Sequence, residues 1–230
     1  MAGKNRSQAI AGAPSGEITL RALEPSDWPN IVRLFGSNGA CGGCWCMWWR
    51  VPRGGKLWAE AKGGKNRAAF RRLVQQGSVR GVLAFSGKQP VGWCSFGPRS
   101  SFPRLERVRA LKRDWAEGTW SVNCFYIARA WRGRGIAKRL VEEATIQAFQ
   151  SGASEVEAYP VMPVEPGTAM PAVFAWTGVP AMFESNGYRE LSPQDGRRRR
   201  VFLAKANQSR VTTRRDRKKS SGSHRGPAVK

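Results

Sequence analysis

Hydrophobic and polar residues alternate in several short segments of the chain, a pattern typical of half-buried β-strands. It predicts strands over residues 17–23, 79–85, 90–96, 120–127, 155–161, 188–191 and 199–204. In the first strand, Ile18, Leu20 and Ala22 are expected to face inward. Ser86-Gly87-Lys88 and the segment 192–196 are short turn-forming stretches, so the strands on either side of each are expected to form antiparallel hairpins.

Apolar residues recur at helical spacing in the intervening segments. One stripe consists of Trp28, Ile31, Val32 and Phe35, with Ser26 or Asp27 as the cap and Gly36 as the end. Further helices are predicted over residues 56–62, 66–76 (capped by Asn66), 103–113, 135–150 and 172–186, the last one broken near Gly178 and Pro180. A long loop is expected over 162–171. Strands with interspersed helices predict a mixed α/β fold.

The most informative segment is an apolar strand that runs through a basic, glycine-containing loop into a helix, over residues 125–140. Gly133 and Gly135 allow the backbone to bend so that successive N–H groups converge. The first turn of the helix adds free N–H groups and the positive end of the helix dipole. Positive charge comes from four side chains: Arg132, Arg134, Lys138 and Arg139. This arrangement predicts a site for a pyrophosphate.

Two glycines alone also occur in ordinary tight turns, so the type of loop matters. The P-loop pattern Gly-x-x-x-x-Gly-Lys-Ser/Thr is absent, and Lys138 stands where a dinucleotide fingerprint needs its third glycine. The pattern Arg132-x-x-Gly135-x-Ala137 instead resembles the Arg/Gln-x-x-Gly-x-Gly/Ala signature of the GNAT acetyltransferase superfamily.

The resemblance extends over residues 17–205, because the later strand at 155–161 and the segment 181–188 follow the order of elements in that family. It implies a central, mostly antiparallel sheet with flanking helices and a crossover after the acetyl-CoA loop. It also implies that acetyl-CoA is the co-substrate. The residues expected to hold it are Phe125, Tyr126 and Ile127, through their backbone, and Arg132, Gly133, Arg134, Gly135, Ile136, Ala137 and Lys138.

By the same resemblance, the protein is expected to transfer acetyl to a primary amine by direct attack in a ternary complex. The acceptor is a small molecule or a peptide amine that the sequence does not identify. Other acyl chains, an acyl-CoA-binding sensor without turnover, and an RNA-binding protein acting through its basic tail stay open as alternatives.

The acid and base of this reaction are not obvious from the sequence. Many family members place a tyrosine where this chain has Phe183, and phenylalanine cannot protonate a leaving thiolate. Of the three tyrosines, Tyr126, Tyr159 and Tyr188, we take Tyr126 as the catalytic candidate. The single histidine, His224, lies in the tail, so Glu157 is our candidate base. Glu155 points to the same face by alternation.

A cysteine- and tryptophan-rich segment at residues 41–50 is the other unusual feature. Its thiols lack the paired Cys-x-x-Cys spacing of structural zinc sites, so no metal is expected, although Cys94 or Cys124 could complete a ligand set. We interpret the segment as a wall of the acceptor pocket, where Trp45, Trp48 and Trp49 would stack on an aromatic or cationic acceptor. A buried aromatic and thiol strand is the simpler alternative.

Residues 44–50, Cys-Trp-Cys-Met-Trp-Trp-Arg, also resemble a segment in a subgroup of bacterial GNAT proteins of unassigned substrate. A cysteine that itself carries the acetyl group is conceivable. It would need a neighbour that lowers its pKa, and no histidine is available.

The formal net charge of +23 is concentrated near the C-terminus, where residues 197–230 contain 13 Lys and Arg and one acidic residue. Residues 1–16 and 206–230 are expected to be disordered, and residues 17–205 to form the acetyltransferase domain. The basic tail would act as a solubilising segment or make weak contact with RNA or another polyanion. No apolar run is long enough to cross a membrane and no secretory signal is evident, so we expect a cytoplasmic protein without membrane contact.

Overall fold

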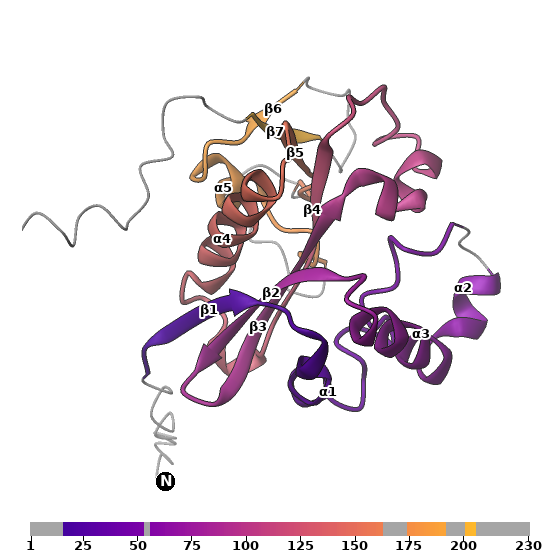
Figure 1. Cartoon of the computed structure of the whole chain (residues 1–230), viewed down its shortest axis with the longest axis vertical. Helices are drawn as coiled ribbons and strands as arrows, with labels where there is room; N and C mark the ends of the chain where they lie inside the picture. The colour runs from indigo at the N-terminus through magenta and orange to yellow at the C-terminus, as the bar shows by residue number, and fades with distance from the viewer. Residues whose placement is uncertain (1–15, 53–55, 163–173, 192–200, 206–230) are drawn as a thin grey trace, which may run out of the picture.

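The computed structural model describes residues 16–52, 56–162, 174–191 and 201–205 (Figure 1). The predicted disorder in residues 1–15 and 206–230, almost all of the predicted loop 162–171 and the turn at 192–196 lie outside the described residues.

The described strands and helices alternate along the chain much as the hydrophobic pattern predicts. The strands are β1 (Ile18–Ala22), β2 (Arg80–Ser86), β3 (Gln89–Pro98), β4 (Thr119–Ile127), β5 (Glu155–Ala158), β6 (Arg189–Glu190) and β7 (Phe202–Lys205). The α-helices are α1 (Trp28–Phe35), α2 (Lys56–Ala61), α3 (Gly64–Gln75), α4 (Ile136–Gln150) and α5 (Pro180–Glu184). Short 3-10 helices lie at Pro25–Asp27, Arg99–Ser101, Pro103–Arg107 and Arg129–Trp131.

These strands form one sheet in the order β1-β2-β3-β4-β5-β7-β6. Neighbouring strands are antiparallel except β4 and β5, which are parallel and are joined through α4. The fold is therefore the mixed α/β fold with a mostly antiparallel sheet and a crossover after the basic loop, as the resemblance implies.

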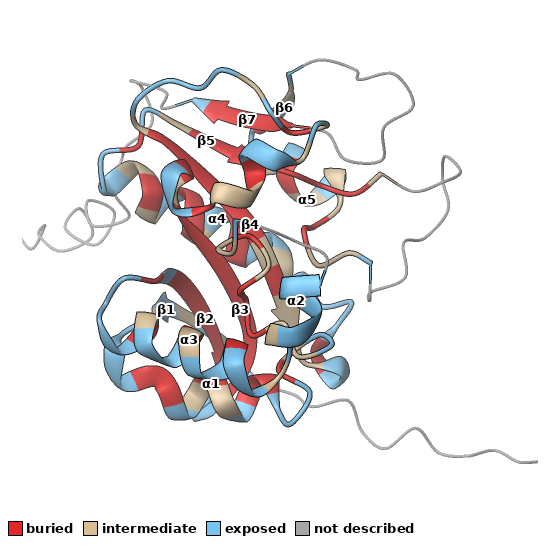
Figure 2. Cartoon of the chain, turned by 90° about the vertical axis from the view of Figure 1, so that its right-hand side faces the viewer, coloured by how far each residue is buried: buried red, intermediate tan, exposed pale blue. Residues whose placement is uncertain are grey.

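Helices cover both faces of the sheet, with α4 on one side and α1 and α3 on the other (Figure 1). The strands between them are almost entirely buried (Figure 2). On the α4 face, Leu140 and Val141 pack against sheet residues such as Val122 and Phe125. On the other face, an aromatic group that includes Phe35, Phe70 and Trp93 fills the space between α1, α3 and the sheet.

Several local predictions were wrong in detail. Asn66 does not cap a helix, because α3 begins at Gly64 and the buried Asn66 amide donates to the Gly43 carbonyl at 3.2 Å. Ala22 is exposed, since β1 is an edge strand whose last residue extends beyond the core. The predicted helix at 172–186 is helical only over α5 in its described part, and the one at 103–113 is a 3-10 helix that ends at Arg107.

A β-bulge in β4 changes which side chains share a face. Ser95 pairs with Cys124 and Phe96 with Val122, so Asn123 is the extra residue. Simple alternation would place Val122, Cys124 and Tyr126 on one face. Instead, Val122 and Phe125 face α4, while Cys124 and Tyr126 pack with the aromatic group on the other face. The bulge therefore directs Cys124 and Tyr126 to the side on which the cysteine-rich segment lies.

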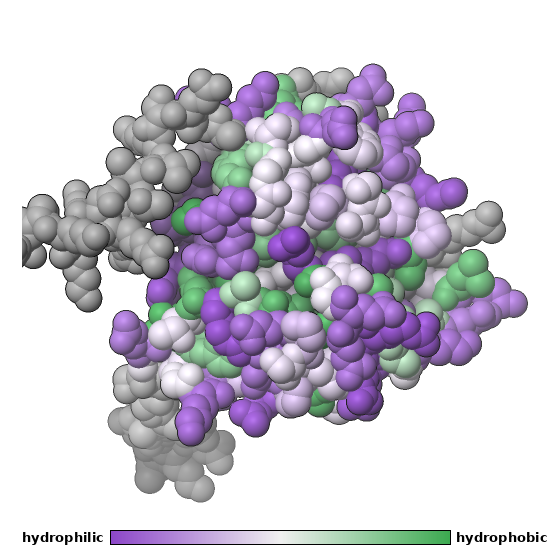
Figure 3. All heavy atoms as spheres, viewed as in Figure 1, coloured by the Kyte–Doolittle hydropathy of each residue, from purple (hydrophilic) through white to green (hydrophobic). Residues whose placement is uncertain are grey.

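The surface seen in Figure 3 is mostly hydrophilic, with apolar side chains mainly in a band across its middle. Among the described helices, none combines the length and apolarity needed to cross a membrane.

Candidate functional site

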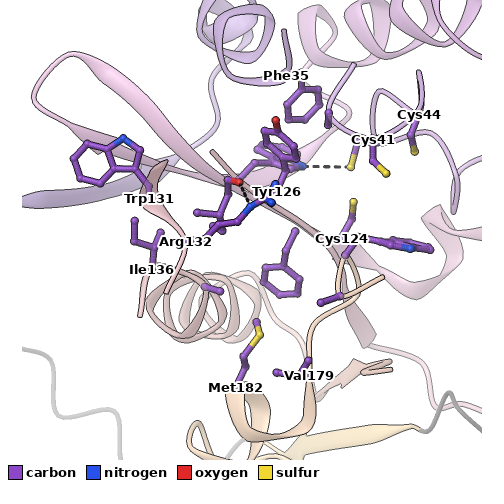
Figure 4. Close-up of a pocket in the computed structure, with 18 of the residues that line it drawn as sticks. Phe35, Cys41, Cys44, Cys124, Tyr126, Trp131, Arg132, Ile136, Val179 and Met182 are labelled. Atoms are coloured by element: carbon purple, nitrogen blue, oxygen red, sulfur yellow. Dashed lines mark hydrogen bonds between the residues drawn. The ribbon is translucent and has the colours of Figure 1, made fainter. Parts of the chain in front are cut away.

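A cavity of about 900 Å³ lies beside the C-terminal half of β4. Six parts of the fold line it: the end of α1 with the cysteine-rich loop, α2, β3 through Trp93, β4, the basic loop with the start of α4, and the segment 175–182. Figure 4 shows Phe35, Tyr126 and the thiols of Cys41, Cys44 and Cys124 toward one end, and Trp131, Arg132 and Ile136 toward the other. The cavity thus brings a thiol-rich and aromatic end together with a basic end.

The cavity exists because β4 and β5 separate. Their parallel pairing runs from Thr119 with Glu155 to Val122 with Ala158, and β4 then continues alone on that side to Ile127. The chain segment around Trp176 crosses the gap, where its carbonyl accepts the Phe125 N–H at 2.7 Å. An unpaired strand edge beside a helix N-terminus presents backbone donors and acceptors to a bound molecule.

The basic loop has the geometry that its sequence predicts. Gly133 and Gly135 have φ of +74° and +71°, and Gly135 is the residue that precedes α4. A Cβ at either glycine would meet no atom within 4 Å, so the left-handed backbone and not crowding requires glycine there. All seven loop residues predicted to hold the cofactor, from Arg132 to Lys138, line the cavity.

Two details differ from the predicted anion site. Arg139 points away, because its guanidinium donates to the Ile18 carbonyl at 2.9 Å and the residue does not line the cavity. Arg132 donates through Nε to the Ile127 carbonyl at 3.0 Å, which ties the loop to the end of β4. Phe125, Tyr126 and Ile127 all line the cavity, although the Phe125 N–H is bonded to Trp176.

Glu157 lies outside the cavity, in a group of four charged residues and a tyrosine that we call the Glu157 cluster: Arg99, Arg113, Glu155, Glu157 and Tyr159. Its carboxylate is fully buried, accepts from the Tyr159 hydroxyl at 2.6 Å, and pairs with Arg99 at 3.2 Å and with Arg113. Glu155 faces the same side, as alternation predicts, and pairs with Arg113 at 2.8 Å. A carboxylate held by two guanidinium groups does not reach an amine in the cavity, so this placement does not support the predicted role of Glu157 as a base.

Of the three tyrosines, only Tyr126 lines the cavity. Burial raises the pKa of Tyr159 and of Tyr188, whose hydroxyl shares a hydrogen bond with Thr145 at 2.7 Å. Phe183 is fully buried against Phe125 and Tyr188, so the position that is often a tyrosine in the family contributes packing here.

The cysteine-rich segment is an irregular loop and not a strand. Trp45 and Cys46 adopt φ of +47° and +57°, a left-handed backbone that costs a non-glycine residue about 1 kcal/mol or more. Cys41, Cys44, Cys46 and Trp48 line the cavity, whereas Trp45 and Trp49 are buried outside it. The predicted pocket wall therefore involves Trp48 but neither Trp45 nor Trp49.

Two aromatic residues that the sequence did not single out complete this wall. The ring centroid of Trp58, in α2, lies 5.0 Å from that of Trp48, and the ring centroid of Trp176 lies 6.2 Å from it. Both rings meet Trp48 edge to face. The outer side of Trp48 is covered by the Arg104 guanidinium, 3.5 Å from the ring centroid. Their aromatic character was the only sequence signal for Trp58 and Trp176, because no local sequence pattern brings either of them to Trp48.

One thiol has a distinct environment. Trp93 Nε1 donates to Cys46 Sγ at 3.3 Å. A hydrogen bond from the Cys124 thiol lowers the pKa of Cys46 despite burial, and the positive charge of Arg50 acts in the same direction. Burial instead raises the pKa of Cys44 to about 12 and that of Cys94 well above its ordinary value. Within the described ranges, no group of three or more His, Cys, Asp or Glu residues is placed to hold a metal ion.

Comparison with known proteins places this geometry in context. The profile described as Acetyltransferase (GNAT) family matches residues 46–169, which include the end of the cysteine-rich segment from Cys46, the sheet centre and the basic loop. A search of curated proteins gave no match.

Three solved structures illustrate the likeness in fold. An N-acetyltransferase from Staphylococcus aureus is 12% identical, with 83% of this chain and 99% of that chain covered and a TM-score of 0.47. The PaiA N-acetyltransferase from Thermoplasma acidophilum, in complex with coenzyme A, is 15% identical, with 82% of this chain and 99% of that chain covered and a TM-score of 0.46. A ribosomal-protein-S5-alanine acetyltransferase from Vibrio fischeri is 12% identical, with 85% of this chain and 96% of that chain covered and a TM-score of 0.46. Because the family profile covers more than half of the sequence, this chain belongs to the GNAT acetyltransferase family.

Proposed function

We propose that this protein transfers an acetyl group from acetyl-CoA to a primary amine, by direct attack of the amine while both substrates are bound. The observation that carries the proposal is the basic loop from Arg132 to Lys138, which lines one end of a cavity that continues along β4. Glycines with positive φ at the start of α4 leave the first N–H groups of the helix free for a pyrophosphate.

Acetyl-CoA would lie with its pyrophosphate on the basic loop and its acetyl thioester beside the end of β4. When bound, it supplies an activated acetyl carbonyl. The role of Ile127 and its neighbours is to offer backbone donors toward the oxygen on which negative charge develops. The Phe125 N–H would join them only after it leaves the Trp176 carbonyl.

The acceptor would enter at the thiol-rich and aromatic end, between Trp48, Trp58 and Trp176. A small amine or a peptide N-terminus fits this proposal. The proposal also includes the resemblance of residues 44–50 to a subgroup of bacterial GNAT proteins of unassigned substrate. Tyr126, at the boundary between the two ends, stays our candidate for the acid, although coenzyme A thiolate is a fair leaving group without one.

Calorimetry of the full chain with acetyl-CoA, followed by detection of acetylated amines from a panel, tests the proposal. We expect Gly135→Glu to weaken acetyl-CoA binding by roughly a hundredfold, about 2.7 kcal/mol, because it places a carboxylate and a strained backbone at the anion site. Gly87→Glu, in the exposed β2–β3 turn with φ of +55°, controls for strain alone. Binding without acetyl transfer to any amine would contradict the transferase and favour a sensor.

A further inference from the structure

Direct attack needs a neutral amine, and primary alkylamines are protonated at neutral pH. A group near the acceptor must therefore take a proton. Among the described residues that line the cavity there is no aspartate, glutamate or histidine. The predicted base, Glu157, is enclosed by Arg99, Arg113 and Tyr159 outside it. Among the described residues, the cavity thus has neither a carboxylate nor an imidazole to act as the base.

Cys46 occupies the position that such a base would need. It lines the acceptor end, and side chains from β3 and β4 face it. Trp93 on β3 donates an N–H to its sulfur at 3.3 Å, and Cys124 on β4 faces it because the bulge at Asn123 turns that side chain toward the loop. Hydrogen bonds from such donors favour the thiolate over the thiol.

The charge of Arg50 supports the same assignment. Its Nε is buried and has no hydrogen-bond partner in the described structure, and Nη2 donates to Ser95 Oγ at 3.4 Å. No described carboxylate forms an ion pair with Arg50. Arg50 is half-buried and stacks on the Phe102 ring at 4.8 Å, and Cys46 is the anionic candidate on which its charge acts. The remaining titratable groups that face Cys46 are the thiols of Cys44 and Cys124, and the thiol of Cys94 interacts with it from the α4 face of the sheet.

We propose that the Cys46 thiolate is the general base of the reaction, a role that rests on the proposed function. The acceptor ammonium gives one proton to Cys46 Sγ. The freed lone pair forms the C–N bond while the C–S bond of acetyl-CoA breaks, and the second nitrogen proton neutralises the departing thiolate. Cys46 then releases its proton to water, so the thiolate is restored. Arg50, Trp93 and Cys124 are positioning residues in this scheme.

Two nucleophiles of different basicity test the assignment. Phenethylamine is an ammonium at neutral pH and suits the aromatic wall, whereas hydroxylamine is uncharged and needs no base to expose its lone pair. The full chain with acetyl-CoA is offered each one, and the acetylated product is measured by mass spectrometry against a blank without protein. We expect Cys46→Ser to slow transfer to phenethylamine by about a hundredfold or more. Transfer to hydroxylamine should stay within a few-fold of the unmodified protein and shows that the variant is folded.

Cys94→Ser is the matched control, because it removes a buried thiol from the α4 face of the same sheet. It should affect both nucleophiles equally. An equal loss on both nucleophiles in Cys46→Ser, or no loss on either, would overturn the assignment. So would transfer by the unmodified protein to hydroxylamine alone.

Incubation of the protein with acetyl-CoA but no amine, followed by an acid quench, tests whether Cys46 acts as a nucleophile instead of a base. An acetyl thioester on Cys46 in its intact-mass and peptide spectra would make the residue a nucleophile and would also overturn the assignment. Failure of the proposed function looks different: the unmodified protein would then bind no acetyl-CoA by calorimetry and would acetylate neither nucleophile, and the assignment would fall with it.

Discussion

Two groups of chemically rich residues lie on the same face of the sheet, and they differ in how their charges are balanced. In the Glu157 cluster, two carboxylates meet two guanidinium groups and a tyrosine hydroxyl. In the second group, which we call the Cys46 cluster (Cys46, Arg50, Trp93 and Cys124), one guanidinium meets thiols and an indole N–H. Trp49 packs beside Tyr159 and immediately precedes Arg50 in the chain.

The difference shows which of the two groups is available for chemistry. The Glu157 carboxylate is satisfied on both oxygens and lies away from the cavity, so it fastens the segment that contains Arg99 and Arg113 to β5. Cys46 borders the cavity, and the pKa of its thiol is lowered by its neighbours, whereas burial raises the pKa of Cys44. A satisfied charge network stabilises a fold, whereas a group with an incomplete charge balance beside a cavity can exchange a proton.

The largest difference between the two clusters is expected when the Glu157 carboxylate is removed, because that change should affect stability most. We expect Glu157→Ala to lower the free energy of unfolding by roughly 3 kcal/mol, because the fully buried Arg99 then keeps only the partly exposed Glu106, 3.1 Å away, as a carboxylate partner. Urea denaturation measures this loss. Glu60→Ala, which removes a partly exposed partner of Lys56 on α2, should cost less than about 1 kcal/mol. Similar losses in the two variants would mean that the Glu157 cluster does not stabilise the fold.

A second change addresses the charge in the Cys46 cluster. Arg50→Met removes a cation that favours the thiolate, so the pKa of Cys46 should rise by about one unit or more. The thiolate then forms only at higher pH, and alkylation of Cys46 by iodoacetamide should shift to higher pH by the same amount. Peptide mass spectrometry at a series of pH values measures the shift.

Arg104→Met is the matched control for that experiment, since it removes an arginine that stacks on Trp48 but is not among the groups acting on Cys46. The alkylation profile of Cys46 should not move. A shift of equal size in both variants would show that Arg50 acts only through the overall positive charge of the protein.

The smallest expected effect concerns the support of the cysteine-rich loop. Asn66→Ala removes one buried hydrogen bond to the Gly43 carbonyl, which still accepts from Gly63, and should lower the free energy of unfolding by about 1 kcal/mol. Urea denaturation beside Gln75→Ala, an exposed position on the same helix expected within about 0.5 kcal/mol, tests this. Equal stability of Asn66→Ala and the unmodified protein would show that α3 does not support the loop.

Much of the fold was predictable because it depends on local patterns. Alternation and helical spacing located the strands and most helices to within a few residues, and the glycines at 133 and 135 identified the basic loop. The predictions were wrong where contacts with residues distant in the sequence determined the local structure. Asn66 bonds to a distant carbonyl instead of capping α3, and the segment before Pro180 crosses the gap beside β4 instead of continuing a helix.

The sequence by itself determined the order of the elements, the basic and glycine-containing character of the loop from Arg132 to Lys138, and the resemblance to the GNAT family, which the family comparison confirmed. Those features depend on residue type and spacing within one short stretch of chain. The tertiary structure alone decided which ionisable side chains border the cavity. Glu157 faces a pair of arginines from another segment, while a single extra residue at Asn123 turns Cys124 toward Cys46. Both outcomes follow from contacts between residues far apart in the sequence, where strand register and burial govern direction and charge.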